Sequence, residues 1–388
     1  MSHELRPVDA RASELLRALA RNRSDSELPT IPDLAAQVSE WDTVLRLAEE
    51  HRVVPLLISC LPDIEKFVPP ETRQALQTAQ DRNAFHCLAN ASELISILGE
   101  FGAEDIPAMP FKGISLAASV YGDLTARSAG DLDFLVFYHD LGRATSALHA
   151  RGFHLQTPTK IDGSPAVEKY YEYHFERPTD GMVAELRWRL ELTEQQKFQR
   201  DLGMEWVWPR RSTVRIAGAD VPDMNPMDKL LVLCMHATKH RWSRLVWICD
   251  VARVLETQPD LNWRAVGSEA RRRGLWRCLA LGVLLADRVC RANVPAAVLK
   301  DFLADRGVHR LAIAFAESLF DAPGRIPSSR VPYNLRILDF SDRIRWVLAM
   351  EFLRPNERDY AMVRLPAVLS PLYFVIRPIR LFLDRSAR

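Results

Sequence analysis

The stretch FKGISLAASVYGDLTARSAGDLDFLV, from Phe111 to Val136, decides the fold, because it joins a Lys-Gly turn to an apolar run that contains two aspartates. Side chains alternate across a strand, so Asp131 and Asp133 point to one face while Leu132 and Phe134 point to the other. Two carboxylates this close repel and raise each other's pKa unless a cation lies between them. The stretch therefore predicts a cation site where a buried strand begins.

The surroundings of the two aspartates favour magnesium and a phosphate ligand. Magnesium prefers carboxylate oxygens and keeps water positions that substrate phosphates can take. Lys112 and Gly113 come just after one strand and just before a helix, where backbone N–H groups bind phosphate. Glu185, in the apolar strand MVAELRWRL, offers a third carboxylate. An isolated pair of aspartates would more often be structural, with Asp131 capping a turn and Asp133 meeting an arginine such as Arg127; the context favours the metal site instead.

Hydrophobic periodicity predicts three regions along the chain. Apolar residues recur at helical spacing from residue 13 to about 103, punctuated by Pro69-Pro70 and Gly102. From residue 106 strand-like and helical segments alternate, and the turn PTDG, at 178–181, joins two strands. Helical spacing returns after VRIAGADVPDMNP. We expect a mostly helical α+β protein, in which a small mixed-sheet core is flanked by N-terminal and C-terminal helical regions.

The segment MPFKGISLAASVYGDLTARSAGDLDFLV resembles the active-site signature of the DNA polymerase beta-like nucleotidyltransferase superfamily. More narrowly, it is similar to the bacterial family described as uncharacterised nucleotidyltransferases. The segments LRLAEEHRVVPLL, LVLCMHATKHRWSRLVWICDVARVL and ERDYAMVRLPAVLSPLYFVIRPIRL fit that family's pattern in the same order, so the resemblance extends from about Trp41 to Leu381. It implies a helical region at 1–103, a nucleotidyltransferase-like core at 104–218, a helical domain at 219–330 and, at 331–388, a Pro/Arg-rich tail that packs on the core.

The resemblance also assigns roles to residues. Asp131 and Asp133 become the metal-binding pair, Glu185 becomes the third acid, and Lys112, Gly113 and Ser115 bind the phosphates. The sequence departs from the pattern in two places. Ile114 stands where a small residue is expected, and Arg187 stands where related families often carry histidine.

Further candidates lie in the C-terminal helices. His236 and His240 share a helical face at metal-ligand spacing, but no glutamate follows the first histidine as in zinc peptidases, so a zinc site is the minor reading. Lys239, His240 and Arg244 are predicted to form a basic edge that faces the triphosphate, with a solvated helix end as an equal alternative. Asp250 lies in an apolar helix and needs a partner, for which Lys239 or His236 is expected. Arg127 is expected to contact a phosphate or, equally, to pair with Asp131.

Composition limits the function classes. The chain has 388 residues, and its 51 basic and 50 acidic side chains nearly cancel, so no stable nucleic-acid partner is expected. Six scattered cysteines without a CxxC pair indicate buried thiols in a reducing compartment. We find no signal peptide and no transmembrane segment in the sequence, which makes the cytoplasm the expected location.

The resulting hypothesis is a nucleotidyltransferase. With Mg²⁺, or Mn²⁺, it would move a nucleoside monophosphate from a nucleoside triphosphate to a hydroxyl or phosphate acceptor and release pyrophosphate. The resemblance implies a peptide or a sugar-linked acceptor. Three alternatives stay open: transfer of a sugar or another group from a nucleotide sugar to a phosphopeptide, addition of nucleotides to RNA by a toxin-like enzyme, and a non-catalytic nucleotide-binding adaptor.

Overall fold

A computed structural model describes residues 10–21, 29–156, 171–190, 202–320, 333–340, 343–344, 372–373 and 376. Its N-terminal region is helical, as the periodicity predicts, and α6 begins at Pro70, the second residue of the Pro69-Pro70 signal. Pro at the first helical position is favoured because its missing N–H would have no partner there. The elements of this region are α1 (Ala10–Leu19), α2 (Ile31–Ala35), α3 (Trp41–Glu50), α4 (Val54–Ser59), α5 (Leu61–Ile64), η1 (Glu65–Phe67) and α6 (Pro70–Ala103).

A mixed five-stranded sheet forms the centre of the chain, in the order β1-β2-β5-β4-β3. β2 pairs in parallel with β5, and the other pairs are antiparallel. The turn at 178–181 joins β4 to β5 as predicted, with Gly181 at a φ of 69°. The strands are β1 (Ala108–Pro110), β2 (Asp131–Val136), β3 (His154–Leu155), β4 (Glu172–Arg177) and β5 (Met182–Arg187).

Short helices connect the strands of this sheet. α7 (Gly113–Leu116) and η2 (Ala117–Tyr121) follow β1, whereas η3 (Tyr138–Asp140) and α8 (Leu141–Ala150) follow β2. Gly152, with a φ of 80°, comes two residues after α8 ends, and glycine commonly takes this left-handed conformation at the end of a helix.

A two-stranded hairpin was not predicted. β6 (Ser212–Ile216) and β7 (Ala219–Asp223) pair across Ala217 and Gly218, which both have positive φ. Two residues of positive φ match the right-handed twist of the strands that they join. α9 (Met204–Val207) and η4 (Trp208–Arg210) precede the hairpin. The boundary expected after residue 218 falls inside it, so we propose that the C-terminal helical region starts at Pro226.

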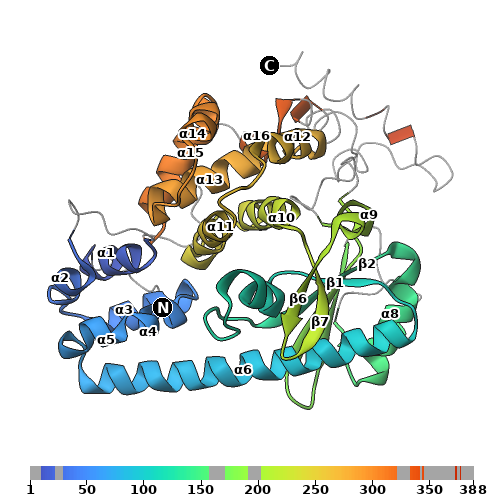
Figure 1. Ribbon diagram of the computed structural model, residues 1–388, viewed down its shortest axis with the longest axis horizontal. Coiled ribbons are helices and arrows are strands. Elements are labelled where there is room, and N and C mark those ends of the chain that lie inside the picture. The colour runs from blue at the N-terminus through green and yellow to red at the C-terminus, as the bar shows by residue number, and fades with distance from the viewer. Residues whose placement is uncertain are drawn as a thin grey trace.

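The C-terminal region is an array of helices around α13 (Figure 1). Asn225 caps its first helix by accepting the N–H of Asp228 at 3.1 Å. Most of the predicted tail at 331–388 lies outside the described residues. The helices are α10 (Pro226–Lys239), α11 (Leu245–Thr257), α12 (Trp263–Arg273), α13 (Trp276–Cys290), α14 (Ala296–Leu303), α15 (Arg306–Ser318) and α16 (Tyr333–Ile337).

Two hydrophobic cores are joined by α6, which runs along the molecule beneath both (Figure 1). Leu76, in its first half, belongs to the core shared by the N-terminal and C-terminal helices. Leu94, Ile97 and Phe101, in its second half, belong to the core beneath the sheet. The predicted fold class, mostly helical with a small mixed sheet, is confirmed. No helix among the described residues is long and apolar enough to cross a membrane.

Candidate active site

Three carboxylates meet at the edge where β2 and β5 run side by side. Asp133 of β2 is the register partner of Glu185 of β5, which confirms that the third acid lies beside the pair. One ligand oxygen from each of Asp131, Asp133 and Glu185 lies within 4.8 Å of the others. Asp133 is buried, whereas the other two are half-buried. The alternation of side chains along two parallel strands therefore produces the cluster.

Two cations hold this acidic cluster together. Lys112 Nζ lies 2.8 Å from Asp133 Oδ1, and Arg187 Nη2 donates to Glu185 Oε2 at 2.5 Å. Arg187 also pairs with Glu172 of β4 and stays 3.9 Å from Asp133 Oδ1. Glu172 was not among the predicted site residues, although its register opposite Arg187 follows from the β4–β5 turn.

Burial and neighbouring charges shift the pKa values of Asp133 and Glu185 in opposite directions. Burial raises the pKa of Asp133, as do the charges of Asp131 and Glu185, and Lys112 offsets only part of this. Burial also acts to raise the pKa of Glu185, but Arg187 and Lys112 outweigh it and the pKa falls. Asp133 Oδ1 is buried and, among the described residues, has the ion pair with Lys112 but no well-directed hydrogen bond. An acid in this condition gains from a further cation.

The turn before α7 explains the Lys-Gly sequence. Lys112 has a φ of 64° and Gly113 a φ of 43°. A Cβ at position 113 would stand 3.3 Å from the carbonyl oxygen of Asp131, so the turn packs directly on the strand that carries the acids. Glycine therefore allows both the backbone conformation and the close approach. Ile114, the departure from the family pattern, is buried in the core beneath the sheet.

Ser115 does not face the acidic cluster. Its buried hydroxyl donates to Asp223 Oδ1 at 3.0 Å, and Lys229 Nζ lies 2.6 Å from the other oxygen of that carboxylate. The same ammonium donates to Ser119 at 2.6 Å. The expected phosphate contact of the Ser115 hydroxyl is corrected: the side chain ties α7 to β7 and α10.

The segment that leads into Asp131 is held by one face of α6. Asn83 Nδ2 donates to the carbonyl of Thr125 at 2.9 Å, and Asn90 Nδ2 donates to that of Ala129 at 3.3 Å. Between them, Cys87 Sγ lies 3.5 Å from the carbonyl of Arg127. Residues four and three apart share a helical face, so α6 binds every second carbonyl of this segment. The polar character of Asn83 and Asn90 in an otherwise apolar face is the signal that could have revealed this contact.

Arg127 and Asp250 pair with each other. Arg127 Nε and Nη2 each donate to a different oxygen of Asp250 at 2.9 Å, and Tyr121 donates to the same carboxylate at 2.7 Å. Both charged groups are buried. The prediction that Asp250 has a partner is confirmed, but the partners expected, Lys239 or His236, were wrong. Arg127, expected at a phosphate or at Asp131, instead joins the segment before β2 to α11.

The C-terminal end of α10 lies within electrostatic reach of the site. His236 and His240 have ring centroids 4.6 Å apart, and both rings contact Trp247. Burial lowers the pKa of His240 to about 4, and Lys239, Lys112 and Arg187 add to the effect. Two of these cations belong to the acidic site, so the end of α10 that carries His240 lies near it, but at this lowered pKa His240 is neutral and adds no positive charge to the predicted basic edge.

Arg244 and Arg52 extend this edge. Burial lowers the pKa of Arg244, Arg52 lowers it further and Asp131 raises it. Arg244 also lies over the ring of Trp247, at 5.4 Å from its centroid. Arg52 Nη1 lies 3.9 Å from the place that a Cβ at Gly130 would take. Sequence reasoning missed Arg52, because nothing in the loop after α3 shows that it reaches a segment almost eighty positions away.

The acidic cluster fits a divalent cation. In the described part of the chain it is the only group of three or more His, Cys, Asp or Glu side chains with the spacing of metal ligands. His236 and His240 therefore lack the further ligands that a zinc site needs. Carboxylate oxygens suit Mg²⁺ and Mn²⁺. Lys112 is the cation with which a metal ion would compete for Asp133.

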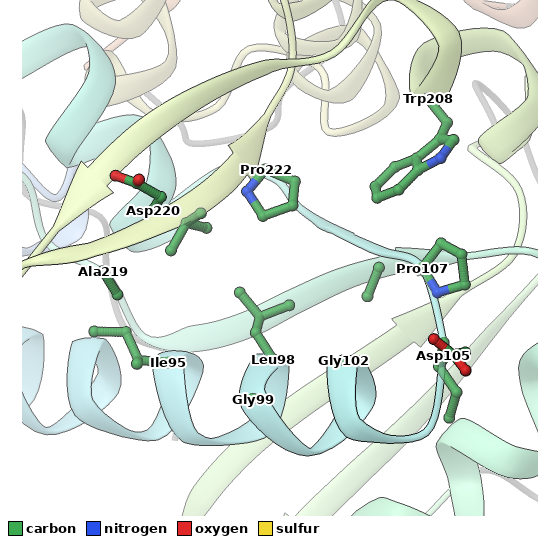
Figure 2. A pocket seen from close by; sticks show the side chains of 13 residues that line it. Ile95, Leu98, Gly99, Gly102, Asp105, Pro107, Trp208, Ala219, Asp220 and Pro222 are labelled. Atoms are coloured by element: carbon green, nitrogen blue, oxygen red, sulfur yellow. The ribbon is translucent and has the colours of Figure 1, made fainter.

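A separate pocket of about 490 Å³ lies at the opposite end of β2 (Figure 2). Figure 2 shows Leu98 of α6, Pro107, Pro222 of β7 and Trp208 around it. It includes Ala108, which pairs with Val136. Val136 comes five residues after Asp131, or roughly 16 Å along the strand. This pocket is therefore not part of the acidic site.

Comparison with known proteins supports the same assignment. The family model described as "Uncharacterised nucleotidyltransferase" matches residues 37–291, which is more than half of the chain. No curated protein matches the chain.

Two solved structures are similar over part of the chain. The solution structure of the antibiotic-resistance factor ANT(2'')-Ia has 12% sequence identity and a TM-score of 0.30, and the match covers 59% of this chain and 97% of that one. The crystal structure of an antigenic nucleotidyltransferase-like protein from Paracoccidioides brasiliensis has 14% identity and a TM-score of 0.30, with 54% and 96% covered. Similarity at this level carries no argument about the reaction.

Proposed function

Because the chain belongs to the family of uncharacterised nucleotidyltransferases, we propose that it transfers a nucleoside monophosphate from a nucleoside triphosphate to an acceptor hydroxyl or phosphate, with release of pyrophosphate. The observation that carries this proposal is the register of β2 and β5. It brings three carboxylates within 4.8 Å of one another beside the Lys112-Gly113 turn.

Each residue has a proposed task. Asp131, Asp133 and Glu185 would hold Mg²⁺, or Mn²⁺, which when bound supplies positive charge at the phosphates and lowers the pKa of the acceptor hydroxyl. Lys112 would turn from Asp133 to the triphosphate, beside the backbone of Gly113. Glu185 would orient the acceptor oxygen or take its proton, and Arg187 would keep that carboxylate ionised.

The C-terminal helices have the second proposed task. Lys239 and Arg244 would offset the charge of the triphosphate beside acids that would otherwise repel it, and His240, neutral because of its lowered pKa, would contact the triphosphate only as a hydrogen-bonding group. The cysteines agree with the proposed cytoplasmic location, since all six carry free thiols. A peptide or a sugar-linked acceptor remains part of the proposal.

The test is calorimetric binding of each nucleoside triphosphate with Mg²⁺, followed by an assay of pyrophosphate release. We expect one or more nucleotides to bind only with the metal, and Asp131→Asn to lose this binding. Asp220→Asn is the matched control, because Asp220 is exposed on β7 and, in the part of the chain that the structure describes, pairs only with the exposed Arg215.

Absence of metal-dependent binding for every nucleotide would refute the proposal. Binding without pyrophosphate release would favour the adaptor. Release of a nucleotide from a nucleotide sugar would favour group transfer from that donor.

A further inference from the structure

A cavity of about 440 Å³ lies between the N-terminal helices and α11. This volume is within the range of about 300–1,000 Å³ that is typical of small-molecule sites. Its walls come from α1, α4, α11 and the segment between η2 and β2. The apolar part of the wall includes Val53, Pro55, Leu56, Val246 and Ala252.

Arg52 connects this cavity to the acidic cluster. It lines the cavity and is exposed, and its guanidinium reaches Gly130, the residue before Asp131. Its φ of 56° is uncommon for a residue other than glycine. Here it belongs to the turn that ends α3, in which the N–H of Val53 donates to the carbonyl of Ala48 at 2.8 Å.

Arg52 is also the available cation of this cavity. Asp123 accepts the N–H and the hydroxyl of Thr125 at 2.8 and 3.0 Å, and Arg253 pairs with Glu256 at 2.8 Å. By contrast, no hydrogen bond or ion pair joins the guanidinium of Arg52 to another residue within the described ranges. The cavity thus combines a largely apolar wall with one available guanidinium, that of Arg52, which lies beside Gly130. A ligand with an apolar body and an anionic end complements it.

We propose that this cavity binds the acceptor, and that the acceptor is an amphipathic small molecule that ends in a carboxylate or a phosphomonoester. The inference rests on the proposed function. Arg52 would hold the anionic end beside Asp131. One anionic oxygen attacks the α-phosphorus of the nucleoside triphosphate, an O–P bond forms, and pyrophosphate leaves with the electron pair of the P–O bond that breaks. The attacking oxygen carries no proton, so Glu185 then serves only as a carboxylate ligand.

Three probes that share one apolar body test the assignment: 1-naphthoate, 1-naphthyl phosphate and 1-naphthol. Calorimetry on the full chain, without nucleotide or metal, measures their affinities. We expect one or both anions to bind at least about tenfold more tightly than 1-naphthol, because only the anions can form a hydrogen bond with Arg52 in which both partners are charged. The preferred anion distinguishes the two kinds of acceptor.

Variants locate the probes in the cavity. Arg52→Gln is expected to reduce the preference for anions to less than about twofold. Ser59→Trp, at an exposed position of the cavity wall, is expected to weaken the binding of all three probes, because the larger side chain fills the cavity. Ala252→Phe is expected to have the same effect from the opposite helix. Arg215→Gln, an exposed arginine on β6, is the matched control and should change none of them.

Equal affinity for 1-naphthol and both anions overturns the assignment, as does an unchanged preference in Arg52→Gln. Displacement of the anions by a nucleoside triphosphate also overturns it, because the probe would then occupy the nucleotide site. These experiments need no metal-dependent transfer. Probe binding therefore tests the cavity alone, whereas pyrophosphate release tests the proposed nucleotidyl transfer, so either can fail without the other.

Discussion

The segment that leads into β2 joins two clusters of charge, one that contains Arg127 and one that contains Asp131, and the clusters differ in how completely their charges are matched. Arg127 and Asp250 form two parallel hydrogen bonds of 2.9 Å, and the hydroxyl of Tyr121 donates a third hydrogen bond to the same carboxylate. In the acidic cluster, three carboxylates share Lys112 and Arg187, and one buried oxygen has no hydrogen bond within the described residues. The first cluster is complete without a ligand, whereas the second gains from one. A structural site and a binding site can therefore use the same residue types and differ in whether every buried polar atom has a partner.

Removal of one partner from the complete pair should give the largest effect on stability. Asp250→Ala leaves the buried Arg127 uncompensated, so the free energy of unfolding should fall by about 3–5 kcal/mol in urea titrations. Asp220→Ala, which breaks the exposed pair with Arg215, should cost less than about 0.5 kcal/mol. The double variant Arg127→Met/Asp250→Leu should recover much of the loss. Equal costs for Asp250→Ala and Asp220→Ala would contradict the distinction.

Removal of one acid from the incomplete cluster should affect function instead. Asp133→Asn removes a carboxylate whose charged form is already disfavoured by burial and by its acidic neighbours, and Glu185 still attracts Lys112, so the free energy of unfolding without metal should change by less than about 1 kcal/mol. Nucleotidyl transfer should fall by about a hundredfold or more, because the metal loses a ligand. Urea titration and pyrophosphate release measure the two quantities, with Asp220→Asn as the control. A large loss of stability would assign Asp133 to the structure rather than to the metal.

A buried neutral group extends the comparison. His51 accepts the N–H of Leu245 at 3.1 Å through Nδ1, and burial lowers its pKa to about 4, with Glu50 opposing and Arg17 and Arg244 adding to the shift. The unfolded chain, with an ordinary pKa near 6.5, therefore takes up a proton first as the pH falls. Stability should be complete above pH 6.5 and decline toward pH 4, by about 2–3 kcal/mol.

His51→Gln should reduce this decline, since an amide accepts the same hydrogen bond and does not titrate. The difference between the two proteins in urea titrations from pH 7 to pH 4 isolates His51 from His236 and His240, which also have lowered pKa values. The prediction fails if both proteins lose stability in parallel.

The smallest effect is expected where α6 holds the segment between the two clusters. Asn90→Ala removes one hydrogen bond to the carbonyl of Ala129 and should cost about 1 kcal/mol. Transfer should fall as well, because Ala129 lies two residues before Asp131. Gln77→Ala, which removes an exposed hydrogen bond to Asp81 on the same helix, is the control and should affect neither quantity. Similar results for both variants would show that the contact with Ala129 does not position the site.

The parts of the site that lie on strands could be predicted, because a period of two places Asp131 and Asp133 on one face without knowledge of the partner strand. Glu185 needed the parallel pairing of β5 with β2, which the sequence did not show; the family pattern was what assigned this residue as the third acid. Lys112 and Gly113 followed from the change of period between β1 and α7. These inferences use neighbours that are close in the chain or in the sheet.

The rest depended on long-range packing. The partner of Asp250 lies 123 positions away, and nothing in an apolar helix indicates which arginine will reach it. Ser115 was assigned to the phosphates through the family resemblance, whereas the rotation of α7 turns its hydroxyl to Asp223. The β6–β7 hairpin was missed because its strands are short and largely polar. Its turn at Ala217-Gly218 was the available signal.

The long helix α6 has a consequence for how the chain can vary. Its first half packs into one core, its second half into the other, and Asn83, Cys87 and Asn90 match the carbonyls before Asp131. One inserted residue would rotate everything after it by about 100° and advance it by about 1.5 Å. Both the second core and the carbonyl contacts would then be out of register. Insertions and deletions should therefore be tolerated in the loops around the sheet but not between residues 76 and 90 of this helix.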